Sequence, residues 1–240
     1  MGERYAAISD IHGNAEARRV ALADIEALAA PPILNLGDIA SDPLAPSEVM
    51  EIVMATPMRS PRGNHDRALV EDDPASMGTT DAVTHAALTA ERLDWLGMLP
   101  FSLEIGNIFT CHATPCHDEN YWLERVTPEG DVVQRALGGI AAEAEGLTAS
   151  LYLFGHSYLA RSVPLPDGAL LVNPRSVGCP TDADVALVPH KVDAGCAYAR
   201  YAIVTRTTTS WEVRHRALPY DTTRMAAAAR AYGRDDWRGR

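Results

Sequence analysis

The chain has 240 residues, of which 47% are hydrophobic and 22% are charged, a balance typical of globular proteins rather than of disordered or fibrous ones. The formal net charge is −11 at pH 7 and no basic stretch occurs, which argues against nonspecific binding to nucleic acid, because such binding depends on clustered lysine and arginine side chains. No apolar run approaches the ~18 residues of a membrane span, and the first residues lack the basic and apolar regions of a secretory signal. We therefore expect no membrane association and a cytoplasmic location.

Short apolar runs alternate with helical stretches in the first half of the chain, and this alternation predicts strands joined by helical crossovers. The expected strands are residues 4–9, 33–36 and 58–60, and the expected helices are residues 14–30, 46–55 and 79–99. Asn14 can cap the first of these helices, and Pro31 and Pro32 mark its end.

The second half of the chain contains mainly strand patterns. The expected strands are residues 108–111, 151–154, 169–172, 197–205 and 210–215. This shift from helix to strand favours a layered α/β fold, in which two sheets pack face to face and helices cover the outside. Residues 1–240 are expected to form one domain, because mixed α/β enzymes of this length commonly fold as a single unit.

The four cysteines are irregularly spaced and form no Cys-x-x-Cys pair; they are Cys111, Cys116, Cys179 and Cys196. This spacing indicates neither a zinc knuckle nor a disulfide framework, so buried free thiols are expected. Cys111 in particular should face the core, because side chains alternate along a strand.

Polar residues follow an apolar strand at five places in the chain. These places are Asp10-Ile11-His12, Gly37-Asp38, Gly63-Asn64-His65-Asp66, His112 and Gly155-His156. Each piece is a weak signal by itself, but a chain without a metal site has no reason to place hydrogen-bonding side chains at five strand ends, where each needs a partner. Ligands of open α/β sheets bind beyond the carboxyl ends of the strands, so we expect the five segments to line one site.

In that order, the five segments resemble the blocks of the calcineurin-like metallophosphoesterase superfamily, which run D-x-H, G-D, G-N-H-D/E, H and G-H. The resemblance covers residues 5–180 and is closest to small bacterial and archaeal phosphoesterases, whose glycine-rich mouth loop here is residues 173–178. It implies a single calcineurin-like metallophosphoesterase domain with the α/β fold of a four-layer αββα sandwich. In that fold, two mixed β-sheets lie face to face and are flanked by helices.

The resemblance also implies a site for two divalent metal ions. The implied ligands are Asp10 and His12 for the first ion, Asp38 as a bridge between both, and Asn64, His112 and His156 for the second. A bridge suits a carboxylate, whose two oxygens can span ions ~3.5–4 Å apart. The mixed set of carboxylate, imidazole and amide favours Mn, Fe, Co, Ni or Zn ions over Mg, which prefers an all-oxygen shell.

His65 is, by the same resemblance, the residue near the leaving group, so His65 and Asp38 are the expected catalytic residues. Either His65 protonates the leaving group or it stabilises the negative charge that develops there. Asp42 and Asp66 are candidates to orient the His65 imidazole. A purely structural His65 is the alternative.

Two arginines are candidates for contact with the phosphate. Arg62 precedes the Gly-Asn-His block, and its planar fork of donors suits a phosphate, although a surface salt bridge is an equal alternative. Arg175 stands in the mouth loop, where related enzymes usually have glycine. An arginine there could bind substrate or narrow the entrance.

One block departs from the pattern of the family. Many relatives read Gly-His-x-His, and the final histidine binds the first metal, whereas this chain reads Gly155-His156-Ser157-Tyr158. Water can fill the missing position, as in the protein-phosphatase branch. Alternatively, Tyr158 could coordinate as a phenolate, which requires a strong Lewis acid because a phenol has a pKa near ~10.

The expected activity is hydrolysis of a phosphate mono- or diester by a hydroxide that bridges two divalent cations. Helical segments near residues 79–99 and 113–147 are expected to cover the site and select a small phosphorylated substrate. Within them, Tyr121, Trp122 and Trp95 are more typical of packing than of substrate contact.

Several other functions stay open from the sequence. A phosphoprotein or a dinucleoside polyphosphate could be the substrate, and the chain could also be a homo-oligomer. A metal-binding sensor or scaffold with weakened catalysis is the rival from another class. An oxygen-activating di-metal protein is less favoured, because the chain has no Glu-x-x-His pairs on helices.

Overall fold

The computed structural model describes residues 3–29, 31–42, 44–179, 181–184, 188–193 and 197–232. Within this part of the chain, two five-stranded sheets form the centre of the fold, with strand orders β14-β13-β1-β2-β3 and β4-β5-β8-β10-β9. The strands of the first sheet are β1 (Arg4–Ile8), β2 (Ile33–Asn35), β3 (Met58–Arg59), β13 (Tyr198–Arg206) and β14 (Trp211–Pro219). Those of the second are β4 (Ser102–Ile105), β5 (Ile108–Cys111), β8 (Leu151–Leu153), β9 (Arg161–Pro164) and β10 (Leu170–Asn173).

Both sheets are mixed. Strands β1, β2 and β3 are parallel to one another, while β13 is antiparallel to β1 and forms a hairpin with β14. In the second sheet β5, β8 and β10 are parallel, and the two edge strands β4 and β9 are antiparallel to their neighbours. The parallel strands therefore form the part of each sheet from which the five sequence blocks leave.

The two sheets pack against each other through one apolar cluster. Ala7 and Leu34 of the first sheet meet Leu151, Leu153 and Val172 of the second. Side chains alternate between the faces of a strand, so the other face of each sheet must be covered by something else.

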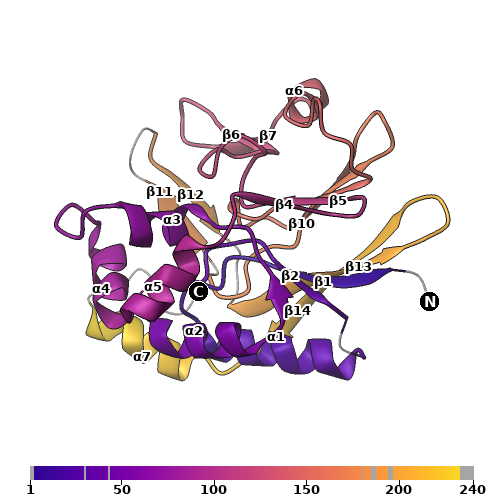
Figure 1. The fold of residues 1–240 in the computed structure, drawn as a ribbon. Helices are drawn as coiled ribbons and strands as arrows, with labels where there is room; N and C mark the ends of the chain where they lie inside the picture. The colour runs from indigo at the N-terminus through magenta and orange to yellow at the C-terminus, as the bar shows by residue number, and fades with distance from the viewer. Residues whose placement is uncertain are drawn as a thin grey trace.

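Helices and a hairpin cover the outer faces, as Figure 1 shows. Helices α1 (Ala15–Ala27) and α2 (Pro46–Ala55) pack on the first sheet, where Ile8 joins Ala21 and Val49 in a shared core. The second sheet is covered by the short helix α6 (Leu137–Ala142) and by Trp122, which is 1% exposed. The structure thus has the predicted α/β sandwich of two mixed sheets between outer layers.

Helix α1 begins as its sequence predicts. The Asn14 side chain accepts a hydrogen bond from the backbone N–H of Ala17 at 3.1 Å, which satisfies a donor that the first helical turn leaves unpaired. Ala17, Ala21 and Ile25, spaced four residues apart, form a buried stripe on the helix. Capping and periodicity together therefore place the helix that follows β1.

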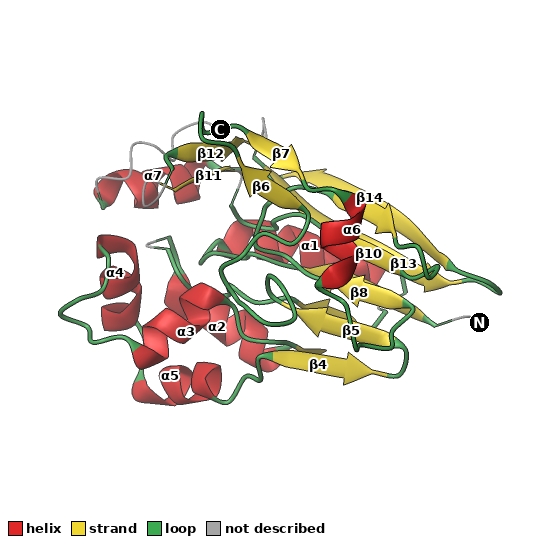
Figure 2. Cartoon of the chain, turned by 90° about the horizontal axis from the view of Figure 1, so that it is seen from above, coloured by secondary structure: helices red, strands yellow, loops and turns green. Residues whose placement is uncertain are grey.

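Helices α3 (Asn64–Glu71), α4 (Thr79–Ala87) and α5 (Ala90–Gly97) gather at one end of the strands (Figure 2). The predicted single helix over residues 79–99 is wrong in one respect, because it breaks between α4 and α5. Leu88 has an extended backbone there, and Thr89 occupies the N-cap position of α5. Threonine at this position favours the start of a new helix over continuation of the old one.

Residues 113–147 differ from the helical segment that we predict. They contain a hairpin of β6 (Glu124–Val126) and β7 (Val132–Gln134), and only α6 is helical. The hairpin of β11 (Thr181–Asp184) and β12 (His190–Asp193) and the helix α7 (Thr223–Ala231) are also absent from the prediction. Three of these four strands, β6, β11 and β12, contain charged residues, so they lack the continuous apolar run that predicts the other short strands.

The cysteines of the described chain are free thiols. Cys111 and Cys179 are buried as predicted, and burial raises the pKa of Cys111 well above its ordinary value. Cys116 is exposed, so the prediction of a buried thiol is wrong there. Cys196 lies outside the described residues. None of the described helices combines the length and the hydropathy of a membrane span.

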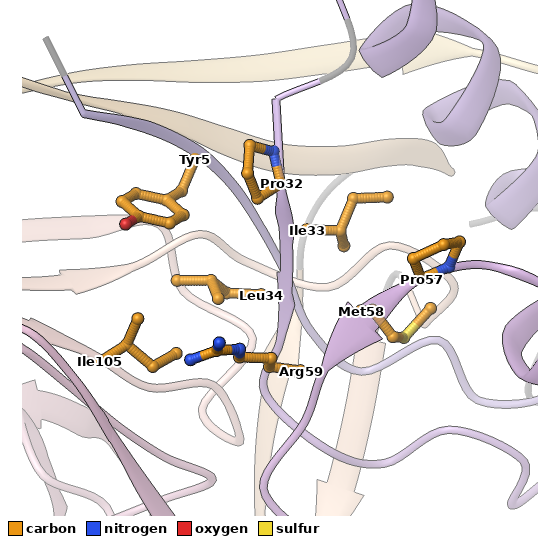
Figure 3. Close-up of a pocket in the computed structure, with 8 residues that line it drawn as sticks. All are labelled: Tyr5, Pro32, Ile33, Leu34, Pro57, Met58, Arg59 and Ile105. Atoms are coloured by element: carbon orange, nitrogen blue, oxygen red, sulfur yellow. The ribbon is translucent and has the colours of Figure 1, made fainter.

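A pocket of about 460 Å³ opens between the two sheets at the edge formed by β3 and β4 (Figure 3). It is lined by Tyr5, Pro32, Ile33, Leu34, Pro57, Met58, Arg59 and Ile105. Ile33 and Met58 are the first residues of β2 and β3. The pocket therefore lies at the amino ends of these parallel strands, opposite the end at which the sequence blocks gather.

Candidate metal centre

Four loops after parallel strands bring the predicted ligands together. Asp10 and His12 follow β1, Asp38 follows β2, His112 follows β5 and His156 follows β8. The loops are joined by backbone hydrogen bonds, among them Asp10 N to Gly37 O at 3.1 Å and Gly155 N to His112 O at 2.7 Å. The first sheet thus supplies three of these side chains and the second sheet two.

These side chains form two groups that could each hold a metal ion. One group is Asp10, His12 and Asp38, and the other is Asp38, His112 and His156. Within each group, the ligand atoms all lie within 4.8 Å of one another. Asp38 belongs to both groups, which is the arrangement that a bridging carboxylate requires.

The two oxygens of Asp38 have different surroundings. Oδ1 accepts a hydrogen bond from the backbone N–H of His65 at 3.0 Å. Oδ2 is buried and accepts no hydrogen bond of good geometry, although it lies 3.2 Å from His112 Nε2 and 3.7 Å from His12 Nε2. A buried carboxylate oxygen between two imidazole nitrogens fits a pair of cations, because each cation would satisfy this oxygen together with one of the two nitrogens.

Each imidazole of the second group has one nitrogen held by a backbone carbonyl. His112 Nδ1 lies 2.7 Å from the carbonyl oxygen of Leu36, and His156 Nε2 lies 2.9 Å from that of Glu119. Such contacts fix the tautomer and leave the opposite nitrogen for a metal. The Oδ1 atom of Asn64, the first residue of α3, lies 3.0 Å from His112 Nε2 and so stands beside the same position.

The imidazole of His12 is held on both sides. Its Nδ1 lies 3.0 Å from Asp42 Oδ2 and 3.2 Å from the carbonyl oxygen of Ser41, and its Nε2 lies 2.8 Å from the Tyr158 hydroxyl. Asp42 therefore orients His12, and not His65 as we predict from the sequence. The Tyr158 hydroxyl stands at the nitrogen that a first metal would bind, which agrees with a position next to that ion.

The structure gives His65 a hydrogen-bonding partner other than the two carboxylates proposed to orient it. Its Nδ1 lies 3.1 Å from Asp81 Oδ1, on helix α4, and 3.3 Å from the Ser41 hydroxyl. Nothing in the sequence signals the contact with Asp81, since the two residues are 16 positions apart and join two different helices.

Asp66 has a different task. Its carboxylate accepts hydrogen bonds from the backbone N–H groups of Asp38 and Ile39, each at 2.9 Å, and of Gly63 at 3.0 Å. Asp66 thus ties the start of α3 to the loop after β2. Asp66 supports the position of Asp38 rather than the orientation of His65.

The charges of the site shift the pKa values of its histidines in opposite directions. Burial by itself lowers the pKa of His12 and His112, but contacts with Asp42 and Asp38 respectively outweigh it and raise each pKa to about 9. Burial, together with the charge of His112, lowers the pKa of His156 to about 4. The His156 imidazole is therefore neutral at pH 7, the form that binds a metal.

Several candidate ligands have backbone angles that favour glycine. The φ angle is 53° at Asp10, 47° at His12, 55° at Asp38 and 66° at His156. Positive φ costs a residue with a side chain ~1–3 kcal/mol, and such strain collects at functional sites. Four strained positions among the candidate ligands indicate that the loops are shaped for the side chains they present.

Two glycines of the sequence blocks are required by close approach of neighbouring atoms. A Cβ on Gly63 would lie 2.1 Å from Asp38 Oδ1, and a Cβ on Gly155 would lie 1.8 Å from the Ser9 hydroxyl. Both distances are far below van der Waals contact. Glycine at these positions leaves the space in which the carboxylates are held.

The two arginines differ in what they contact. Arg62 Nη1 donates to Glu71 Oε1 at 2.7 Å, a salt bridge at the surface and the alternative that we name for it. Arg175 has a φ of 76°, and its backbone N–H donates to Asn173 Oδ1 at 2.8 Å. A phosphate contact by either arginine stays a prediction.

The segment of residues 113–147 reaches the site through Glu119 and Tyr121. The Tyr121 ring lies 5.3 Å from the His156 ring, and its hydroxyl lies 3.0 Å from His190 Nε2. Trp122 is instead a packing residue, as predicted, since its indole N–H donates to Ile140 O at 3.0 Å. Trp95 packs against the first core.

Comparison with known proteins decides the family. The model of the calcineurin-like phosphoesterase superfamily domain matches residues 4–194, most of the chain and all of the candidate ligands. The chain belongs to this superfamily. The family predicted from the five sequence blocks is thereby confirmed.

Three proteins from named organisms are similar to this chain in sequence or in structure. A curated but uncharacterized protein of Methanocaldococcus jannaschii is 29% identical over 195 residues, which cover 74% of this chain and 77% of the archaeal protein. A metallophosphoesterase structure from Sphaerobacter thermophilus has a TM-score of 0.71 at 23% identity and covers 97% of this chain and 95% of its own. A hypothetical protein structure from Pyrococcus horikoshii has a TM-score of 0.74 at 20% identity, with 96% and 93% covered. These two structures establish the fold alone.

Proposed function

We propose that the chain hydrolyses a phosphate mono- or diester with the help of two divalent cations. The observation that carries this proposal is the position of Asp38, whose buried carboxylate is shared by both candidate ligand groups. Asp10 and His12 would hold the first cation with Asp38, and Asn64, His112 and His156 would hold the second. Membership of the phosphoesterase superfamily supports the class of reaction.

When bound, the two cations would supply an activated water and offset the charge of the phosphoryl oxygens. The chain's own residues do the rest. His65 is half-buried beside this position and can hold a proton for the leaving group on the ring nitrogen opposite its contact with Asp81. Burial by itself lowers the pKa of His65, but Asp38 and Asp81 raise it to about 10 in the metal-free chain.

Transition-metal ions fit the donor set better than magnesium does. Three imidazoles, two carboxylates and one amide oxygen form a mixed shell, which favours Mn, Fe, Co, Ni or Zn. The pKa of about 9 at His12 and His112 adds a condition, since each imidazole must lose its proton before it binds an ion.

A small phosphorylated compound is the proposed substrate. Asp81 of α4 contacts His65, and the Tyr121 ring lies beside His156, so both segments can contact the alcohol group of an ester. A phosphoprotein or a dinucleoside polyphosphate stays an alternative substrate. A cytoplasmic location also stays a prediction.

The test combines metal analysis with a panel of chromogenic mono- and diesters. The purified chain is stripped with a chelator, reloaded separately with Mn, Co, Ni, Zn and Mg ions, and assayed for bound metal and for turnover. We expect two ions per chain and hydrolysis of at least one ester class. Two bound ions without turnover of any ester would instead favour a metal-binding sensor or scaffold, and a chain that binds no ion would contradict the site itself.

A further inference from the structure

The contact between His65 and Asp81 joins two elements that the sequence separates. Asp81 lies in the first turn of α4, and its side chain is 17% exposed. Its Oδ1 accepts from the Ser41 hydroxyl and lies 3.1 Å from His65 Nδ1, while Ser41 Oγ is itself 3.3 Å from that nitrogen. The three side chains form a closed triangle of hydrogen-bonding groups at one edge of the site.

Helix α4 is held against the site by a second contact on the same side. Thr84 is fully buried, and its Oγ1 accepts a hydrogen bond from the backbone N–H of Asp42 at 3.1 Å. Residues three apart share one face of a helix, so Asp81 and Thr84 face the loop after β2 together. That loop carries Asp38 and Ser41. The position of α4 and the geometry of the site are therefore linked.

The charge of Asp81 suits this contact. Burial works to raise the pKa of its carboxyl, but the hydrogen bonds from His65 and Ser41 outweigh burial, and the pKa lies below its ordinary value. The negative carboxylate also stands in the first turn of a helix, where an anion is stabilised by the helix dipole. An ionised acceptor next to Nδ1 holds the proton of the imidazole on that nitrogen.

We propose that Asp81 is a positioning residue for His65, supplied by the helix that covers the site. It holds the ring in one orientation with Nδ1 as the donor, so that Nε2 is the nitrogen that serves the leaving group. Such pairing of a carboxylate with a catalytic imidazole has large effects on rate without contact to substrate. The proposal rests on the proposed phosphoesterase activity for its kinetic consequence, but not for its structural one.

The kinetic test compares esters with good and poor leaving groups. Asp81→Ala should lower kcat on an alkyl ester by ~10- to 100-fold, the range for loss of a residue that orients a functional side chain, and much less on the p-nitrophenyl ester, whose leaving group needs little protonation. Asp81→Asn keeps an acceptor without the charge and should fall between. KM and the content of both metals should stay unchanged.

Thr84→Val is the matched control, because it removes the other anchor of α4 and does not touch His65. It should leave the ratio of rates on the two esters as it is in the native chain. If Thr84→Val changes that ratio as much as Asp81→Ala does, displacement of α4 and not orientation of His65 explains the effect, and the proposal is wrong.

A double variant separates action through His65 from an independent role. Asp81→Ala combined with His65→Ala should be no slower than His65→Ala alone, since Asp81 then has nothing to position. Losses that multiply would contradict the proposal.

Nitrogen NMR of labelled histidine gives an answer that does not depend on turnover. In the zinc-loaded chain, the Nδ1–H group of His65 should show the shift of a hydrogen-bonded donor, and this shift should be lost in Asp81→Ala. An unchanged His65 spectrum in that variant would overturn the proposal, even with an active enzyme. If the native chain turned over no ester, the proposed function would fail while the NMR result still decided the role of Asp81.

Discussion

The two candidate ligand groups share Asp38 but differ in composition. The first group has two carboxylates and one imidazole, and its side chains are almost inaccessible to solvent. The second group has two imidazoles with the shared carboxylate, and the amide of Asn64 adds a fourth donor beside His112. The first group has Tyr158, rather than an imidazole, next to His12. One ligand fewer should make the first site the weaker one.

The two groups also differ in how their imidazoles are held in place. The second group is built from imidazoles that backbone carbonyls hold in place, so its geometry is largely preset. The first group instead depends on Asp42 and Tyr158 to place its single imidazole. A site with few ligands exchanges its ion more readily, and we expect the first ion to leave on mild chelation while the second stays.

The largest effect is expected from Asp38→Asn, because it removes the member common to both groups. An amide cannot supply the negative charge that each cation needs, so the content of both metals and the turnover should fall to undetectable levels. Metal analysis and the ester assay measure this directly. Two metals per chain in Asp38→Asn would contradict the bridge.

His65→Ala tests whether the His65 side chain, next to Asn64 in the sequence, acts in catalysis without binding either metal ion. The variant should keep both metals and lower kcat by ~10²- to 10⁴-fold, the contribution of a positioned general acid. Metal content and kcat are measured on the same sample. If the defect comes from loss of an ion, His65 is a metal ligand and belongs to the second group.

Tyr158→His tests whether an added imidazole makes the metal affinities of the two groups more equal. A neutral imidazole in place of the phenol should tighten binding of the first ion by ~10- to 100-fold, because it coordinates without the cost of ionising a phenol. Calorimetric titration of the metal-free chain resolves the two binding events. Tyr158→Phe, which keeps the ring and removes the hydroxyl, is the control and should not tighten the first site.

Two equally tight sites in the native chain, unchanged in Tyr158→His, would mean that another residue supplies the missing ligand. A visible absorption band between tyrosinate and iron would identify Tyr158 itself. Either result would contradict the expectation that the first site binds its ion more weakly because it has one ligand fewer.

Arg18 shows what burial of charge costs where no opposite charge pairs with it among the described residues. It lies on α1 and is 0% exposed, and none of its three guanidinium nitrogens has a hydrogen-bond partner among the described residues. Burial lowers its pKa to about 10. Arg18→Met should therefore raise the free energy of unfolding by ~1–3 kcal/mol, since an apolar chain of similar length removes an unpaired buried charge.

Denaturant unfolding of the two chains, with equal slopes, measures this difference. Destabilisation by Arg18→Met would show that the guanidinium has a favourable partner. In the two ligand groups, by contrast, every buried charge has an opposite charge in contact, and removal of one member should destabilise.

Much of the fold follows from patterns that are local in the sequence. The strand β1, the cap of α1 by Asn14 and the apolar stripe of that helix need only neighbouring residues, so periodicity and capping predict them. Strand β9 and the hairpin of β6 and β7 lack a continuous apolar run; β9 forms by pairing with β10, and β6 and β7 form by pairing with each other. Likewise, the local pattern predicts helix over residues 79–99, whereas the break between α4 and α5 is seen only in the structure.

The sequence by itself determines which residues are available to bind metal, because the chemistry of Asp, His and Asn at strand ends is independent of the rest of the fold. It also determines the family, since the five blocks keep their order along the chain. Only the tertiary structure decides which carboxylate serves which imidazole. Asp42 lies 23 positions from His65 along the chain and Asp81 lies 16, so the sequence does not assign either carboxylate to a ring. In the structure Asp42 contacts His12, whereas Asp81 reaches His65 from another helix.

The physical reason is that hydrogen bonds depend on distances of about 3 Å and on direction, and these are set by how α4 packs on the loop after β2. Packing of one helix against a loop sums many weak contacts between residues far apart in sequence. No spacing in the chain records that sum, so the partner of His65 becomes visible only once the layers are assembled.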